Sequence, residues 1–114
     1  MFDKKDAIKL WEAEMGNTEY AYDFSGKKIK KADYMENNEV GWVVTYLKPI
    51  ELGGPTHIGN TIIMHQRTLE EKGLNYPNFI IVGQEYTVKY DEKGDFYYVE
   101  KVLSDDEDDD SYFI

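Results

Sequence analysis

Hydrophobic residues recur every three to four positions near the start of this chain, which is the spacing of an amphipathic helix. Four apolar residues share one face of a helix that would run from Asp3 to Met15: Ala7, Ile8, Trp11 and Met15. Asp3 or Asp6 can begin this helix, and Gly16-Asn17 ends it. We therefore predict a helix whose apolar stripe covers a core and buries Trp11.

The rest of the chain alternates apolar and polar residues, which predicts β-strands. Strands are expected at 19–24, at 40–47, on both sides of Gly83 within 80–90, and at 96–103. Gly53-Gly54-Pro55 predicts a hairpin turn, and a helix is expected from Arg67 to Lys72, ended by Gly73. The predicted class is α+β, with an N-terminal amphipathic helix, a strand–hairpin–helix unit and a small C-terminal antiparallel sheet.

Several residues between Gly41 and Gly73 have the identity and spacing of a known motif. They are Gly41-Trp42, Pro49, Gly53-Gly54, Asn60 and Lys72-Gly73, and together they resemble the ββα-metal finger of HNH endonucleases. The likeness extends over about 21–88, because Tyr-Pro-x-Phe at 76–79 and a strand pair turned by a glycine also follow the motif in small bacterial and phage HNH proteins. The resemblance implies an HNH-like finger, preceded by a short helix at 32–35.

The positions that act in catalysis in this family hold other residues here. By the family spacing, the Asp and His positions are Thr45 and Tyr46, and the last metal ligand is Leu69. The intermediate Asn is Asn60, and the resemblance implies that its side chain steadies the loop of the hairpin. In the family the Asp and the distal ligand hold a divalent cation, and the His takes a proton from water. A threonine binds Mg²⁺ weakly without carboxylates, a tyrosine with a pKa of about 10 is a poor base at neutral pH, and leucine has no ligand atom. The resemblance thus implies a pseudo-nuclease with no catalytic residue, metal or cofactor.

Composition limits the remaining possibilities. The chain has 114 residues, 41% of them hydrophobic, and this suits a single domain over 1–103. It contains no cysteine, which excludes disulfides and cysteine-bound zinc. We find neither a signal-peptide pattern at the N-terminus nor an apolar stretch approaching a membrane span, so the expected location is the cytoplasm of a bacterial host cell.

Charge is the second informative feature. The chain has 23 acidic and 13 basic residues, a net charge of −10, which opposes binding to nucleic-acid phosphates. Six acids are consecutive at 105–110, and −4 remains without them. We interpret 104–114 as an acidic, flexible tail, with mimicry of a nucleic-acid backbone as the alternative. The apolar end, Tyr112-Phe113-Ile114, favours docking on a partner that combines a basic surface with an apolar pocket.

The leading functional hypothesis is an inactive HNH-fold protein that binds another macromolecule. The expected partner is a nucleic-acid-handling or defence enzyme with a basic surface, as for a phage anti-CRISPR or anti-restriction inhibitor. The candidate contacts are Asp105, Asp106, Asp108, Asp109 and Tyr112, with Asp91 and Glu92 as a second group.

Two alternatives belong to other classes of function. One is an HNH endonuclease with a relocated metal site built from His57, His65 and an acid such as Glu51 or Glu70, although the histidine spacing matches no metal signature and His65 also suits a helix cap. The other is a DNA-binding module that cuts nothing and uses the basic cluster at 27–31. The lysines of that cluster are Lys27, Lys28, Lys30 and Lys31.

Overall fold

A computed structural model describes residues 2–103 of the chain, and the predicted acidic tail lies outside them. The helices are α1 (Lys4–Met15) and α2 (Gln66–Lys72). The strands are β1 (Tyr20–Tyr22), β2 (Lys28–Lys30), β3 (Trp42–Tyr46), β4 (Thr61–His65), β5 (Asn78–Ile81), β6 (Gln84–Asp91) and β7 (Phe96–Lys101). Short 3₁₀ turns occupy Lys31–Asp33, Ile50–Leu52 and Ile58–Asn60. The α+β class is confirmed.

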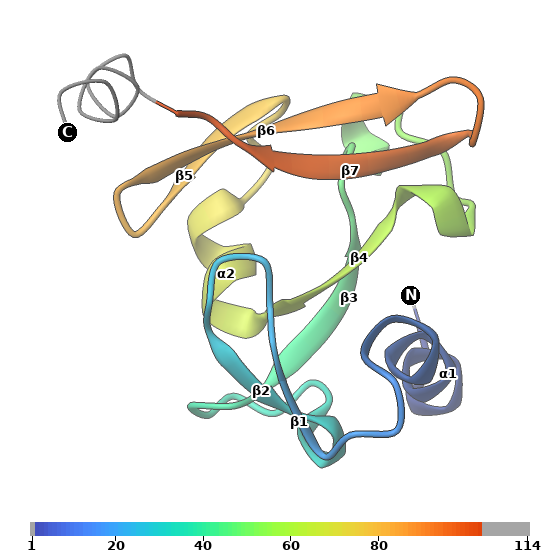
Figure 1. Ribbon diagram of the computed structural model, residues 1–114, viewed down its shortest axis with the longest axis vertical. Coiled ribbons are helices and arrows are strands. Elements are labelled where there is room, and N and C mark those ends of the chain that lie inside the picture. The colour runs from blue at the N-terminus through green and yellow to red at the C-terminus, as the bar shows by residue number, and fades with distance from the viewer. Residues whose placement is uncertain (1, 104–114) are drawn as a thin grey trace, which may run out of the picture.

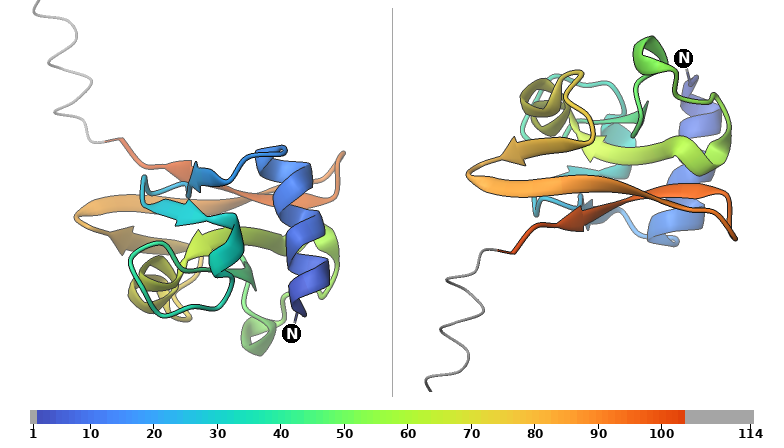
Figure 2. Two further views of the ribbon diagram at one scale, coloured as in Figure 1. Left: turned by 90° about the horizontal axis from the view of Figure 1, so that it is seen from below. Right: turned by 90° about the horizontal axis from the view of Figure 1, so that it is seen from above.

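The strands form three small antiparallel sheets, β1–β2, β3–β4 and β5–β6–β7. Figure 1 shows the β5–β6–β7 sheet at one end and α1 with β1–β2 at the other, while β3, β4 and α2 lie between them. Figure 2 views the domain along this direction, from the end with α1 and β1–β2 on the left and from the end with the β5–β6–β7 sheet on the right. The β3–β4 pair followed by α2 therefore forms the centre of the domain.

Helix α1 forms as the sequence predicts. The side chain of Asp3 accepts a hydrogen bond from the N–H of Asp6 at 2.8 Å, which satisfies one of the free donors of the first turn. Gly16 ends the helix with a φ of 75°, a conformation that suits glycine. Trp11 is fully buried, its ring lies 4.9 Å from that of Trp42, and its indole N–H donates to the carbonyl of Thr18. The predicted burial of Trp11 is confirmed.

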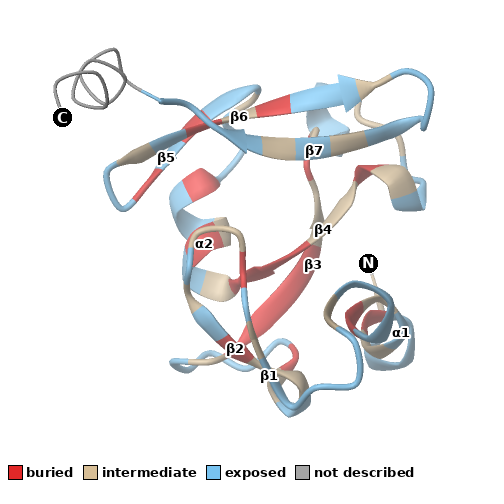
Figure 3. Cartoon of the chain, viewed as in Figure 1, coloured by how far each residue is buried: buried red, intermediate tan, exposed pale blue. Residues whose placement is uncertain are grey.

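Two hydrophobic clusters fill the interior, and the β3–β4 pair contributes to both. The first joins α1 and β2 to the start of the pair, through Trp11, Ile29 and Trp42. The second lies under the C-terminal sheet and includes Leu47, which follows β3 directly. Figure 3 shows buried residues along β3 and β4 and on the inner side of β5 and β6. Alternation places the buried residues of β5 on its covered face, whereas β3 and β4 each have three consecutive buried residues and are covered on both faces there.

The C-terminal sheet also follows its sequence pattern. Val82 and Gly83 form the turn between β5 and β6, both with positive φ, as two-residue hairpin turns of this kind require. Val82 is β-branched and rarely adopts this conformation, so the turn is strained at an exposed position. Asp91 caps the next turn by accepting hydrogen bonds from the N–H groups of Lys93 and Gly94.

The segment around the lysine cluster differs from the prediction. The short helix expected at 32–35 is a single 3₁₀ turn at Lys31–Asp33, which follows β2, the strand that pairs with β1. The β1–β2 hairpin exists because Asp23 and Gly26 form its turn, where the N–H of Gly26 donates to the carbonyl of Asp23. The predicted strand at 19–24 is therefore shorter, and Phe24 lies in the turn, packed against the second cluster.

The carboxylate of Asp23 holds this turn against α2. Its Oδ1 accepts from Ser25 and Lys27 within the turn, whereas its Oδ2 accepts from the N–H of His65 at 3.0 Å and the hydroxyl of Thr68 at 2.7 Å. Burial by itself raises the pKa of Asp23, but these hydrogen bonds outweigh it and hold the pKa below its ordinary value. The charged carboxylate therefore joins segments more than 40 residues apart.

We predict that Asp23→Asn lowers the free energy of unfolding by about 3 kcal/mol at neutral pH, because charge-assisted hydrogen bonds to a buried group are lost. A lowered pKa in the folded state stabilises the fold above the unfolded-state pKa of about 3.9 and ceases to do so as the pH falls through the folded value. Urea unfolding at pH 7 and at about pH 3 should therefore show a smaller penalty in acid. Glu92→Gln, an exposed carboxylate, is the control, and an Asp23→Asn variant as stable as this control would contradict the assignment.

Within residues 2–103, neither helix is long and apolar enough to cross a membrane.

Candidate functional site

Three of the four positions marked by the family resemblance meet at one pocket. Thr45 and Tyr46 end β3, Leu69 lies on α2, and all three line a pocket of about 270 Å³. Helix α2 follows β4 directly and packs against the β3–β4 pair, which brings Leu69 beside the end of β3. The remaining lining residues are Phe2, Val44, Pro49, Ile50, Glu51, Gly73 and Leu74.

The chemistry of this pocket is mainly apolar. The polar residues in its lining are Thr45, Tyr46 and Glu51, and Glu51 stands on an exposed 3₁₀ turn. The ring centres of Phe2 and Tyr46 lie 5.9 Å apart, so the N-terminal segment of the chain forms one wall of the pocket through Phe2. Such a lining suits an apolar group with one hydrogen bond to a hydroxyl, and it supplies no imidazole to accept a proton from water.

Asn60, the fourth marked position, is fully buried and stands apart from this pocket. Its Oδ1 accepts from the N–H of Lys48, and its Nδ2 donates to the carbonyls of Lys48 and Pro55, each at 2.9 Å. The Asn60 side chain thus joins the two ends of the long loop between β3 and β4 by hydrogen bonds to its backbone. Its role here is to hold the hairpin, as the family resemblance led us to expect.

The two histidines serve separate local structures. His65 is buried and begins α2, where its Nδ1 accepts from the N–H of Arg67 and its Nε2 lies 2.8 Å from the carbonyl oxygen of Glu39. His57 accepts from the N–H of Gly59 and begins the 3₁₀ turn at Ile58–Asn60. The capping role considered for His65 is confirmed. In the described part of the chain, no three His, Cys, Asp or Glu side chains are grouped so that they could hold a metal ion.

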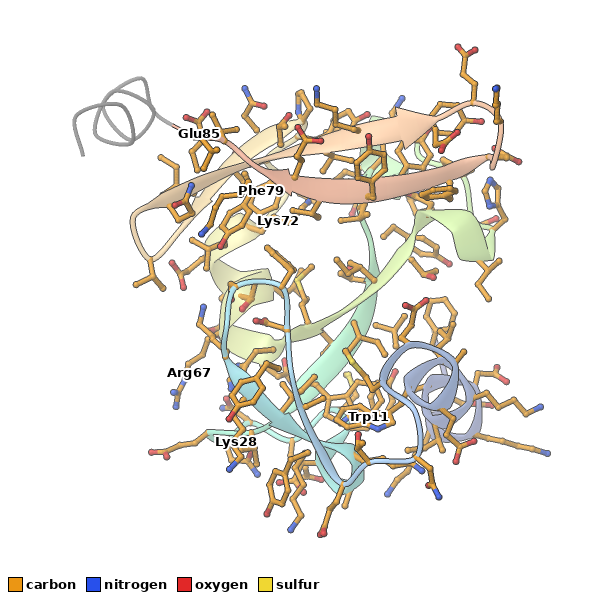
Figure 4. All side chains as sticks on the ribbon, viewed as in Figure 1. Trp11, Lys28, Arg67, Lys72, Phe79 and Glu85 are labelled. Atoms are coloured by element: carbon orange, nitrogen blue, oxygen red, sulfur yellow. The ribbon has the colours of Figure 1, made fainter. Side chains whose placement is uncertain are left out.

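The lysine cluster is largely engaged within the molecule. Lys27 pairs with Glu71 at 3.3 Å and Lys31 pairs with Glu12 at 2.8 Å. Lys30 lies 4.0 Å from Glu19, and the ammonium of Lys28 lies 4.5 Å from the ring centre of Tyr20. Figure 4 shows Lys28 and Arg67 on the same side of the molecule. A phosphate backbone at this surface has to compete with carboxylates already in place.

The structure describes two of the predicted acidic contact residues, Asp91 and Glu92. Asp91 is half-buried, and its carboxylate caps the β6–β7 turn, whereas Glu92 is exposed in the same turn. Asp105, Asp106, Asp108, Asp109 and Tyr112 lie outside the described residues.

Sequence reasoning missed several polar and apolar features of the interior. Asp23 had a local signal, since Asp-Phe-Ser-Gly is a turn sequence, but nothing local pointed to Thr68. Lys72 is almost fully enclosed with its ammonium 5.3 Å from the ring centre of Phe79, and burial lowers its pKa (Figure 4). A groove between β4 and β7 was also missed, because it is formed by residues from opposite ends of the chain.

We predict that Asn60→Ala lowers the free energy of unfolding by about 2–3 kcal/mol, because its buried partners on Lys48 and Pro55 lose their hydrogen bonds. Urea unfolding followed by tryptophan fluorescence measures this loss. Asn78→Ala, at an exposed position, should change stability by less than about 0.5 kcal/mol. Equal stability of the two variants would show that Asn60 does not hold the loop.

No protein-family model, curated protein or solved structure matches this chain.

Proposed function

We propose that this protein is a catalytically inactive HNH-like domain that acts by binding another macromolecule. The observation that carries the proposal is the convergence of Thr45, Tyr46 and Leu69 on one pocket. These are the positions at which the family resemblance places two metal ligands and the general base. Because the three positions line one pocket, the geometry supports the resemblance to the HNH finger. Because none of the three residues is a strong metal ligand or a base at neutral pH, their chemistry supports the loss of hydrolytic function.

The order of elements supports the same proposal. An antiparallel strand pair followed directly by a helix is the layout of a ββα finger, and β3, β4 and α2 have this layout. The resemblance assigns Asn60 the task of steadying the loop, and three hydrogen bonds of its side chain do so. In this proposal the finger is retained as a scaffold, and its surfaces carry the function.

The charge distribution supports a protein partner with a basic surface. The chain carries a net charge of −10, and the lysines at 27–31 are balanced by neighbouring carboxylates or an aromatic ring. Long-range attraction then favours a basic groove, such as those of enzymes that handle nucleic acids. An inhibitor of a defence enzyme, of the anti-restriction or anti-CRISPR kind, is the concrete form of the proposal.

We predict that restoring the family residues creates a nuclease. The variant that combines Thr45→Asp, Tyr46→His and Leu69→Asn should nick plasmid DNA in the presence of Mg²⁺ or Mn²⁺, and the natural protein should not. The variant places a carboxylate, an imidazole and an amide oxygen around the same pocket, which is the ligand and base set of the family. Agarose electrophoresis of supercoiled plasmid measures the nicking.

The matched control keeps Thr45→Asp and Leu69→Asn and leaves Tyr46 unchanged, so that the general base alone is missing. This control should be slower by at least about 100-fold. Nicking by the natural protein that EDTA stops would contradict the pseudo-nuclease proposal. Circular dichroism of each variant separates lost folding from lost activity.

A second prediction concerns the partner. The full chain should bind one or more basic nucleic-acid-handling enzymes with an affinity that falls steeply between about 50 and 500 mM salt, because exposed charges are screened. Surface plasmon resonance against a panel of restriction and CRISPR effector enzymes measures this. A full-length variant with the six acids at 105–110 changed to Asn or Gln should bind more weakly. Absence of binding to the whole panel at low salt would argue against the inhibitor function.

A further inference from the structure

Strand β7 is the open edge of the C-terminal sheet. It pairs with β6, and no other strand among residues 2–103 is hydrogen-bonded to it. The right-hand view in Figure 2 shows β7 as the outermost strand of this sheet. The strand at the other edge, β5, has four residues against six in β7, and it packs against α2. Of the two edges, β7 is therefore the one that can accept a further strand.

The unpaired backbone groups of β7 point away from β6. The N–H of Val102 donates to the carbonyl of Glu85, and along an antiparallel strand the residues that bond to one neighbour alternate with residues that point outward. The N–H and C=O groups of Tyr97, Val99 and Lys101 therefore point outward. None of these groups bonds to another described residue. A row of free donors and acceptors of this kind pairs readily with another extended chain.

The sequence of β7 favours such pairing. Its register with β6 runs from Phe96 to Lys101 without a bulge, and the strand contains no proline. The residues at 96–99 are aromatic or β-branched, and Phe96 and Tyr98 are 40% and 38% exposed. Charged residues occur only at the end of the strand. The devices that usually keep edge strands apart are therefore few in β7.

A groove of about 610 Å³ lies beside this edge. Its apolar lining includes Leu10 and Met15 of α1, Ile62 of β4, and Tyr97 and Val99 of β7. Side chains alternate between the two faces of a strand, so Tyr97 and Val99 lie on the same face of β7. A strand that continues the sheet beyond β7 places its own alternate side chains along this groove. The strand that fits must therefore carry apolar residues at alternate positions.

A second copy of β7 meets these requirements. Two β7 strands related by a twofold axis run antiparallel to each other, as β6 and β7 do. With the axis at Tyr98, Tyr97 of one copy lies opposite Val99 of the other. Both residues point outward, so their backbone groups can exchange hydrogen bonds. Their side chains then lie along the grooves of the two copies, and the two Tyr98 rings lie side by side on the other face of the sheet.

Charge favours the same register. It brings Lys101 of the second copy beside Asp95, whose side chain is 67% exposed. The carbonyl of Asp95 lies against Gly59, so the carboxylate is the group of Asp95 that a second copy can reach. A shift of the register by two residues in one direction would place Lys101 opposite Lys93 of the second copy, and a shift in the other direction would leave Asp95 without a cation. Opposite charges therefore select the pairing centred on Tyr98.

We propose that two copies of this protein form a symmetric dimer by antiparallel pairing of their β7 strands. The pairing joins the two three-stranded sheets into one continuous sheet. Because the interface consists of one strand and one groove from each copy, the expected dissociation constant is about 1–100 µM. The dimer does not depend on the proposed function, since the partner is the protein itself.

Sedimentation velocity of the full chain at concentrations from about 1 to 500 µM tests the dimer. The fraction of dimer should rise with concentration. Association should also tighten between about 50 and 500 mM salt, because each copy carries a net charge of −10 and salt screens the repulsion. This salt dependence is the reverse of that expected for a basic enzyme partner, so the two associations are distinguishable. A monomer under all these conditions would overturn the proposal.

Two proline substitutions locate the interface. Val99→Pro removes an outward-pointing N–H from β7. Ile80→Pro is the matched control, because the bond from the N–H of Val88 to the carbonyl of Pro77 shows that the N–H of Ile80 points outward from β5. Neither substitution removes a hydrogen bond to β6. Val99→Pro should weaken the dimer at least about tenfold, whereas Ile80→Pro should not. Equal weakening by the two variants would place the interface elsewhere and overturn the proposal.

An exchange of charges tests the register without changing the strand backbone. Lys101→Glu and Asp95→Lys should each weaken dimerisation about tenfold at low salt, because two like-charged contacts replace two opposite ones. An equimolar mixture of the two variants should associate at least as tightly as the natural protein, since every contact then joins opposite charges. Lys5→Glu changes the net charge as Lys101→Glu does, at an exposed position on α1, and should leave the dimer unchanged. A mixture that associates no better than either variant alone would overturn the proposal.

Discussion

The buried carboxylate of Asp23 is the interaction on which the arrangement of this domain depends. It closes the turn between β1 and β2 and, through its second oxygen, accepts hydrogen bonds from His65 and Thr68 at the junction of β4 and α2. A charge in this position is costly unless several donors surround it, and here backbone and hydroxyl donors do. Two further polar contacts join the same turn to α2, between the hydroxyls of Ser25 and Thr68 at 3.2 Å and between Lys27 and Glu71 at 3.3 Å.

The consequence of this attachment is the direction of α2. Thr68 and Leu69 are neighbours on the helix, so fixing the first toward Asp23 turns the second toward the end of β3. The pocket that contains Thr45 and Tyr46 therefore depends on a hydrogen bond formed about 100° away around the same helix.

The β3–β4 pair connects two clusters that are each too small to support a fold alone. The first is built on Trp11 and Trp42, and the second on Phe79 and Tyr86, whose rings stack 5.7 Å apart. Because the two clusters meet along one narrow strand pair, two concavities remain beside it, and Val44 lines both. One holds the replaced family positions, and the other is lined by residues of α1, β4 and β7. The proposed pairing of two β7 strands uses the space that this two-cluster construction leaves.

The sequence by itself determined the elements whose signals are local. Helical spacing with Asp3 and Gly16 at its ends predicted α1, and alternation around Gly83 predicted the β5–β6 hairpin, because periodicity and turn chemistry act over a few residues. The spacing of Thr45, Tyr46 and Leu69 also marked three positions that the structure brings together. The short helix expected at 32–35 is only a 3₁₀ turn at Lys31–Asp33, because Tyr34 directly after it forms a bridge with Trp42. Only the tertiary structure decided the long-range partners: the bond of Asp23 to Thr68, the ion pairs of the lysines, and the groove between β4 and β7. Each depends on packing between distant segments, which no local pattern encodes.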